Sequence, residues 1–303
     1  MTYDATPRRD GGAGPDRWFR PAALTTATGL RVAVQPDGEP LRHTGLTVLA
    51  LRDGEAYELS SGPDEYLLLP LSGGGDVDLR SGTLHEILRG REDVFSAAAD
   101  CAYVPRDHQV TVTARGPVEV ALCAARATGD LPPAVLRAPD TPVELRGAGC
   151  SSRQVRNFGT PDAIDATAII ACEVLTPGGN SSSYPPHRHD CTVPGIESEL
   201  EEIYYFRLRA DPAAPDNADP IGFCRVGGSG GDEASWCVRD GDVLLVPAGW
   251  HGPATAVPGY DLYYLNVMAG PGPERRWLIS DDPAHDWVRD TWADQPIDPR
   301  LPF

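Results

Sequence analysis

Short apolar runs alternate with turn-forming clusters along the whole chain, and this pattern predicts β-strands. The runs are rich in β-branched and aromatic residues and are bounded by Gly, Pro, Asp or Ser, as strands of sandwiches and barrels are. They lie at 46–51, 65–71, 101–105, 118–125, 168–175, 202–206, 242–247 and 261–268. Only 284–294 carries a helical pattern. We therefore expect an all-β protein with little helix.

The two halves of the chain repeat one arrangement. In each half a strand opens with glutamate, and a later strand ends in a turn and a histidine; these pairs are Glu65 with His108 and Glu202 with His251. We expect two tandem β units that join within the Pro- and Arg-rich stretch 128–147. The predicted divisions are a flexible tail over 1–20, an N-terminal domain over 21–135 and a C-terminal domain over 136–303.

The segment SYPPHRHD, residues 183–190, is the strongest chemical signal in the chain. His187 and His189 stand two apart in a segment whose preceding prolines disfavour helix. Alternate residues of an extended chain project to the same side, so both imidazoles can share one ion. The N-terminal half has no such pair before Glu65, and we expect it to bind no metal.

Two further residues complete a ligand set. Glu202 opens the run EIYYF, and His251 follows the turn after DGDVLLVP. Three imidazoles and one carboxylate can hold a divalent ion and leave open positions, which is typical of catalytic sites. These donors suit Zn, Mn, Fe or Ni. The twelve residues between His189 and Glu202 leave Glu199 and Glu201 as alternative carboxylates.

Composition restricts the function classes further. The formal net charge is −18 and all 26 basic residues are arginine, so nucleic acid and anionic membranes are unsuitable partners. The lack of lysine excludes a side-chain Schiff base and a P-loop. Seven cysteines form no CxxC pair, and no run reaches the roughly 18 apolar residues of a membrane span. We expect reduced thiols and a cytoplasmic location.

These motifs carry a family resemblance. HRH, EEIYYF and DGDVLLVPAGWH resemble the two metal motifs of the cupin superfamily. The longer strings GGNSSSYPPHRHD, ESELEEIYYFR and PGYDLYYLNVMAGP are similar to the 5-deoxy-glucuronate isomerase family of inositol catabolism. The resemblance covers about residues 155–290, and the N-terminal half matches in layout. It implies a bicupin fold of two tandem β-barrels or sandwiches, with the metal in the second.

The resemblance also implies a reaction. The family converts 5-deoxy-glucuronate, an aldose, into the ketose 5-dehydro-2-deoxy-gluconate, with a metal ion polarising the substrate oxygens. A proton must leave C2, and Glu173 and Tyr204 are the candidate catalytic residues. A carboxylate in the apolar run 168–175 either lines the cavity or faces outward. Tyr204 shares a face with Glu202, where an aromatic residue can equally serve packing.

The substrate carboxylate calls for an arginine, whose planar fork binds carboxylates bidentately. Arg225 is the candidate, and Arg207 is the alternative, with surface exposure as its competing explanation. Tyr264 and Asn266 share one face of the run 261–268 and are candidate substrate-binding residues. We expect a small anionic sugar acid as partner, and the sequence leaves homo-oligomers open. The rival functions are a cupin dioxygenase with Fe(II) and a non-catalytic sugar-binding cupin.

Overall fold

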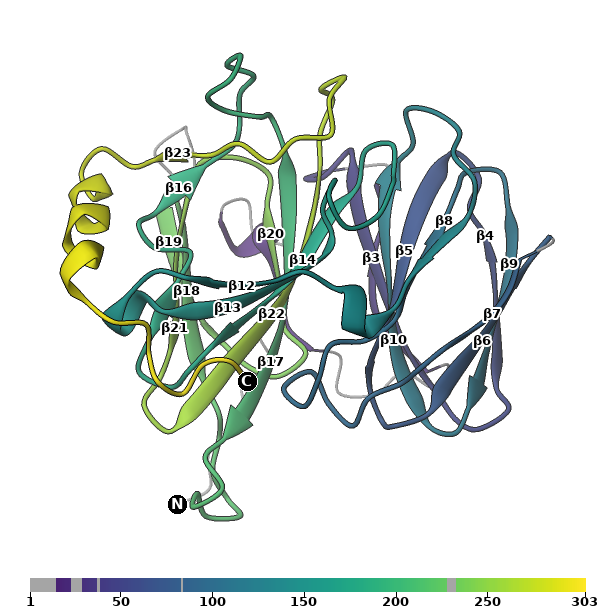
Figure 1. Cartoon of the computed structure of the whole chain (residues 1–303), viewed down its shortest axis with the longest axis horizontal. Helices are drawn as coiled ribbons and strands as arrows, with labels where there is room; N and C mark the ends of the chain where they lie inside the picture. The colour runs from purple at the N-terminus through teal and green to yellow at the C-terminus, as the bar shows by residue number, and fades with distance from the viewer. Residues whose placement is uncertain (1–14, 23–28, 37–38, 83, 228–232) are drawn as a thin grey trace.

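The computed structural model describes residues 15–22, 29–36, 39–82, 84–227 and 233–303. Within these residues the strands form four sheets, which Figure 1 shows as successive layers, two in each half of the chain. Each half is a sandwich of two facing sheets. Each apolar run of the sequence overlaps a strand, so the predicted all-β architecture is confirmed.

The N-terminal half consists of a six-stranded and a four-stranded antiparallel sheet. The larger sheet has the order β11-β8-β5-β10-β3-β2 and the smaller has β4-β9-β6-β7. The strands are β2 (Leu30–Val34), β3 (Thr44–Leu51), β4 (Ala56–Ser60), β5 (Asp64–Ser72), β6 (Asp76–Ser81), β7 (Leu84–Leu88), β8 (Cys101–Val104), β9 (Gln109–Arg115), β10 (Val118–Arg126) and β11 (Ala134–Leu136). Apolar side chains such as Leu68, Val112 and Leu122 fill the space between these two sheets.

The C-terminal half contains the other two sheets. Its larger sheet has the order β1-β20-β17-β22-β14-β13-β12, and its smaller sheet has β19-β18-β21-β16-β23 with β15 beside β21. The larger sheet comprises β1 (Phe19–Arg20), β12 (Val143–Arg146), β13 (Arg153–Gly159), β14 (Ile170–Thr176), β17 (Glu201–Ala210), β20 (Val243–Val246) and β22 (Tyr260–Ala269). The smaller comprises β15 (Ser181–Ser182), β16 (His187–Arg188), β18 (Gly222–Gly227), β19 (Glu233–Val238), β21 (Trp250–Ala256) and β23 (Ser280–Asp281).

Helical structure is confined to short 3-10 segments in the described residues: η1 (Pro15–Trp18), η2 (Ala138–Asp140), η3 (Gly149–Ser151) and η4 (Asp286–Asp294). The last of these covers the helical pattern expected at 284–294. None of them has the length and apolarity that a membrane crossing demands. All seven cysteines are free thiols.

The N-terminal segment belongs to the C-terminal half. Residues 15–20, expected within a flexible tail, form η1 and β1, and β1 pairs with β20. Trp18 is buried, and the ring of Phe19 stacks on Trp236 at 6.4 Å between centroids. The predicted tail is rich in polar residues, but these two aromatic side chains give the segment apolar contacts with the C-terminal half. The remainder of the predicted tail, residues 1–14, lies outside the described residues.

The larger sheets of the two halves pack face to face, so their central strands are buried on both faces. A single apolar cluster includes Leu67 and Leu69 of β5 together with Ala171 of β14 and Leu265 of β22. This explains why β5 and β14 read as continuous apolar runs instead of alternating ones. A polar side chain in these strands therefore faces either a sandwich interior or the interface between the halves.

Glu65 is an interface residue of this kind. Its carboxylate is fully buried and accepts hydrogen bonds from the backbone N–H groups of Thr167, Ala168 and Ile169 at 2.6–2.8 Å. It also accepts one from the Tyr103 hydroxyl at 2.7 Å. The glutamate that occupies the repeat position of Glu202 thus joins the two halves.

Candidate active site

Three histidines meet between the two sheets of the C-terminal half. His187 of β16 lies directly opposite His251 of β21 in strand register, and His189 follows β16. All three are buried, and their ligand atoms lie within 4.8 Å of one another. Glu202 reaches them from β17 in the facing sheet. Its Oε2 atom lies 3.1 Å from Nε2 of His189 and 3.0 Å from Nε2 of His251.

Backbone carbonyl groups fix the orientation of each imidazole. The Nδ1 atoms face carbonyl oxygens at 3.0–3.3 Å, those of Pro185 for His187, Leu200 for His189 and Gly249 for His251. A carbonyl oxygen only accepts hydrogen bonds, so each Nδ1 carries the proton and each Nε2 presents a lone pair to the cavity. This is the arrangement of histidines that ligate metals.

The donor set is left with unsatisfied acceptors. In this tautomer, Nε2 of His251 and Oε2 of Glu202 are two acceptors facing each other at 3.0 Å. Oε1 of Glu202 and Nε2 of His251 are also buried without a hydrogen-bond partner among the described residues. A cation between these atoms removes both deficits. His187, His189 and His251, together with Glu202, could therefore hold a metal ion.

The pKa shifts of His187 and Glu202 agree with that role. Burial, followed by the nearby His251 and His189, holds the pKa of His187 well below its ordinary value, so this imidazole is neutral. Burial opposes ionisation of Glu202, but His251 and His189 outweigh it and hold the pKa of this carboxyl below its usual range. At His189, burial lowers the pKa, but the hydrogen bond and charge of Glu202 outweigh burial and raise it. The neutral imidazole of His187 and the ionised carboxylate of Glu202 are forms that bind metals.

Tyrosine and serine hydroxyl groups lie beside the histidines. Tyr204 lies two residues beyond Glu202 on β17, and its ring centroid is 6.2 Å from that of His251. Its hydroxyl lies 3.2 Å from Oγ of Ser183, which in turn lies 2.9 Å from the hydroxyl of Tyr264. Tyr264 donates a further hydrogen bond to Ser182 at 3.1 Å. Sequence reasoning missed both serines, although they stand immediately before the histidine motif.

Strand β22 also places Asn266 beside these hydroxyl groups. Asn266 is opposite Tyr204 in the register of β17 and β22, and its Oδ1 atom is buried without a partner in the described chain. The face of β22 that carries Tyr264 and Asn266 therefore looks into the site, whereas Tyr263 faces the other half. The structure places both expected substrate-binding residues beside Tyr204.

The alternation of β17 also selects the carboxylate. Glu202 faces the histidines, whereas the adjacent Glu201 faces the N-terminal half and accepts hydrogen bonds from the backbone N–H groups of Arg42 and His43 at 2.7–2.9 Å. Glu199 lies on the preceding loop. Among the three carboxylates considered, Glu202 alone contacts the histidine rings.

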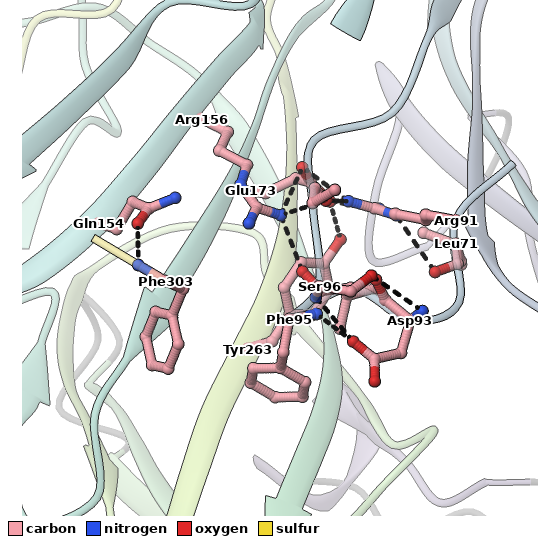
Figure 2. Close-up of polar contacts among 12 residues, drawn as sticks. Leu71, Arg91, Asp93, Phe95, Ser96, Gln154, Arg156, Glu173, Tyr263 and Phe303 are labelled. Atoms are coloured by element: carbon pink, nitrogen blue, oxygen red, sulfur yellow. Dashed lines mark hydrogen bonds and ion pairs between the residues drawn. The ribbon is translucent and has the colours of Figure 1, made fainter. Parts of the chain in front are cut away.

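The structure does not bring Glu173 to the site. Figure 2 shows it at the interface between the halves, flanked by Arg91 and Arg156. Arg91 pairs with its Oε1 atom at 2.5 Å, Tyr263 donates to the same atom at 2.9 Å, and Arg156 lies 3.7 Å from Oε2. Because both faces of β14 are buried, a polar residue in this apolar strand can point away from the cavity. The expected catalytic base is thus an interface residue.

The two expected carboxylate clamps also have other partners. Arg225 of β18 donates from Nε to Glu233 at 2.8 Å. Arg207 of β17 pairs with Glu119 of the N-terminal half and, at 2.9 Å, with Asp240. Cys224, the neighbour of Arg225, points inward instead, where burial and Glu202 raise the pKa of its thiol. Strand alternation therefore directs Arg225 away from the histidines.

Comparisons with known proteins agree with this geometry. The chain matches the KduI/IolB family over residues 18–288. It belongs to that family. It is 36% identical over 276 residues to 5-deoxy-glucuronate isomerase of Geobacillus kaustophilus, covering 91% of this chain and 96% of the relative. The isomerase of Bacillus subtilis is 33% identical over 273 residues, covering 89% and 97%.

Two solved structures share the overall architecture of this chain. An IolB-like protein from Salmonella typhimurium superposes with a TM-score of 0.80 and 31% identity, covering 89% of this chain and 98% of that one. Oxalate decarboxylase from Bacillus subtilis superposes with a TM-score of 0.58 at 12% identity, covering 90% and 80%. The second likeness shows the shared cupin-type fold alone.

Replacement of a histidine tests the metal centre directly. We expect the purified protein to carry about one divalent ion per chain, and His251→Ala to retain only a small fraction of it, because one of four ligands is lost. Elemental analysis by mass spectrometry measures both. The matched control is His108→Ala at the equivalent position of the N-terminal half, which should keep the full metal content. Equal metal in the two variants would contradict this assignment.

Replacement of Glu173 tests its structural position. Glu173→Gln leaves Arg91 and Arg156 buried without an anion, so the free energy of unfolding should fall by about 3–5 kcal/mol. Metal content and the turnover of the folded fraction should stay unchanged. Denaturant unfolding and elemental analysis provide the measurements, with Tyr263→Phe as a control that removes one hydrogen bond. A large loss of turnover at unchanged stability would return Glu173 to the catalytic residues.

Proposed function

We propose that this protein is a metal-dependent isomerase that converts 5-deoxy-glucuronate into 5-dehydro-2-deoxy-gluconate. The observation that carries the proposal is the convergence of three buried imidazoles and the Glu202 carboxylate beside tyrosine hydroxyl groups. Relatives named 5-deoxy-glucuronate isomerase, aligned over about nine-tenths of the chain, support the choice of reaction.

The ligand set supplies the electrostatic part of the reaction. A divalent ion bound there provides Lewis-acid polarisation of the substrate oxygens, which acidifies the C2–H bond of an open-chain aldose. His187, His189, Glu202 and His251 are the residues that would hold it. We propose that the ion is Zn, Mn, Fe or Ni, because the nitrogen and oxygen donors of the site suit each of these metals.

Tyr204 is suited to manage protons at the substrate oxygens. Burial, with Glu202 as the next cause, raises the pKa of its hydroxyl well above the ordinary value, so this group remains a proton donor. Conversion of an aldose to a ketose adds a proton at O1 and removes one from O2. The linked hydroxyl groups of Tyr204, Ser183 and Tyr264 can donate at one oxygen and accept at the other.

The reaction itself is tested with the metal-loaded protein and 5-deoxy-glucuronate. We expect nuclear magnetic resonance to show the ketose product, also under argon, and chelation of the metal to abolish its formation. Product formation that requires and consumes oxygen would instead identify a dioxygenase. Absence of turnover with tight sugar-acid binding would identify a non-catalytic binding protein.

With C2-deuterated substrate, loss of the label to solvent indicates proton transfer, and full retention at C1 indicates a hydride shift.

Tyr204→Phe tests the proton-donating role. We expect the turnover number to fall by a factor on the order of 10², the range for loss of a general acid, at unchanged metal content. Tyr205→Phe is the matched control, because the next residue of β17 faces the N-terminal half and its hydroxyl lies 3.4 Å from Arg207. Near-normal turnover of Tyr204→Phe would assign this side chain to packing.

A further inference from the structure

Strand β13 carries two buried arginines that face opposite sides of the sheet. Arg156 points to the interface between the halves, where Glu173 lies 3.7 Å away. Arg153 stands three positions earlier and therefore projects to the other side, into the C-terminal sandwich. Only 8% of its surface is exposed. The same strand thus places one guanidinium beside a carboxylate and the other within the half that contains the histidines.

Arg153 has no counter-ion among the described residues. Its Nη1 atom donates to the carbonyl oxygen of Ser151 at 3.0 Å, and its guanidinium lies 5.8 Å from the ring centroid of Trp292. Burial lowers its pKa to about 10, so the group is still charged at neutral pH. A buried charge without a partner is costly, and most buried arginines are paired. A ligand anion would supply the missing charge.

A cavity of about 490 Å³ surrounds this guanidinium. Arg146 and Arg289 also line it, but each has its own carboxylate, Glu144 at 2.8 Å and Asp281 at 2.7 Å. The indole rings of Trp277 and Trp292 form apolar walls. This volume lies within the usual range of small-molecule sites, roughly 300–1,000 Å³, and accommodates a six-carbon sugar acid.

Two connections link the cavity to the metal ligands. The charge of Arg153 acts on the hydroxyl of Tyr264, whose ring centroid lies 4.7 Å from that of Tyr204 beside the histidines. In addition, Asp281, the partner of Arg289, is opposite His187 in the register of β16 and β23. Tyr264 and Tyr204 therefore link the guanidinium to the histidine cluster. An open-chain substrate has a carboxylate at one end for the guanidinium and an aldehyde at the other end for the histidine cluster.

We propose that Arg153 binds the C6 carboxylate of the substrate and makes the enzyme specific for a sugar acid over the corresponding neutral sugar; this inference rests on the proposed isomerase function. The planar fork of the guanidinium offers two parallel N–H donors to one carboxylate. With the carboxylate held at Arg153, the aldehyde end of the chain is directed toward the histidines. Arg153 is a substrate-binding residue that sequence reasoning missed, because an arginine at a strand start carries no distinguishing motif.

Kinetics with two substrates test the inference. Arg153→Met should lower kcat/KM for 5-deoxy-glucuronate by a factor on the order of 10², mainly through KM, because charged hydrogen bonds are lost. The variant should turn over 5-deoxy-glucose, in which a hydroxymethyl group replaces the carboxylate, as the unmodified protein does. An equal loss with both sugars, or retention of the preference for the acid, would overturn the proposal.

Two controls separate binding from structure. The melting temperature of Arg153→Met should equal or exceed that of the unmodified protein, because an unpaired buried charge is removed; a clear decrease would indicate a structural arginine instead. Arg239→Met replaces an exposed arginine paired with Asp219 at 2.9 Å and should leave both kinetic constants unchanged. If Arg225→Met, in place of Arg153→Met, abolishes the preference for the acid, the proposal fails.

A binding measurement distinguishes failure of this inference from failure of the proposed reaction. Calorimetry of the metal-loaded protein should detect gluconate, a six-carbon sugar acid, and show weaker binding of sorbitol, its neutral counterpart. Arg153→Met should reduce gluconate binding to the level of sorbitol. This result supports an anion site at Arg153 even if 5-deoxy-glucuronate is not isomerised. Gluconate binding that is unchanged in the variant overturns the inference whatever the reaction proves to be.

Discussion

The central strands of the larger sheet in the C-terminal half are buried on both faces, and the assignments of Glu202, Tyr204 and Arg153 depend on the alternation of side chains across them. One face packs against the N-terminal half and the other encloses the histidines. Adjacent residues are therefore separated into two environments. Glu202 and Tyr204 face the site, whereas Glu201 and Tyr205 face the other half. The N-terminal sandwich thus covers one face of the sheet that carries Glu202.

Structural and functional residues differ in whether their buried polar groups have partners within the protein. At the interface, Glu65 is surrounded by backbone and side-chain donors, and Glu173 is neutralised by Arg91 and Arg156. Such groups contribute to joining the halves because their charge is compensated within the protein. In the site, by contrast, Oε1 of Glu202 and Nε2 of His251 lack hydrogen-bond partners. Deficits of this kind are expected where an ion or a substrate completes the arrangement.

The strands, part of the site and the family can be predicted from the sequence. The apolar runs between turn residues predict the strands because the signal is local, and the HxH segment predicts two inward imidazoles because extended chains alternate. The choice of Glu202 over Glu201 follows from the same period, once one face is known to hold the histidines. Motif similarity then identifies the family, because residues in the site and the turns before it are contiguous strings.

Only the tertiary structure decided which face of each doubly buried strand looks into the site. The run containing Glu173 is apolar throughout, so its period carries no information about direction, and the packing of the two halves assigns this carboxylate to the interface. The same holds for Tyr263 and Tyr264, two adjacent tyrosines of one strand. Arg153 shows the limit most clearly. Its charge acquires meaning only because no carboxylate is paired with it in the described structure, and a missing ion pair leaves no mark on the sequence.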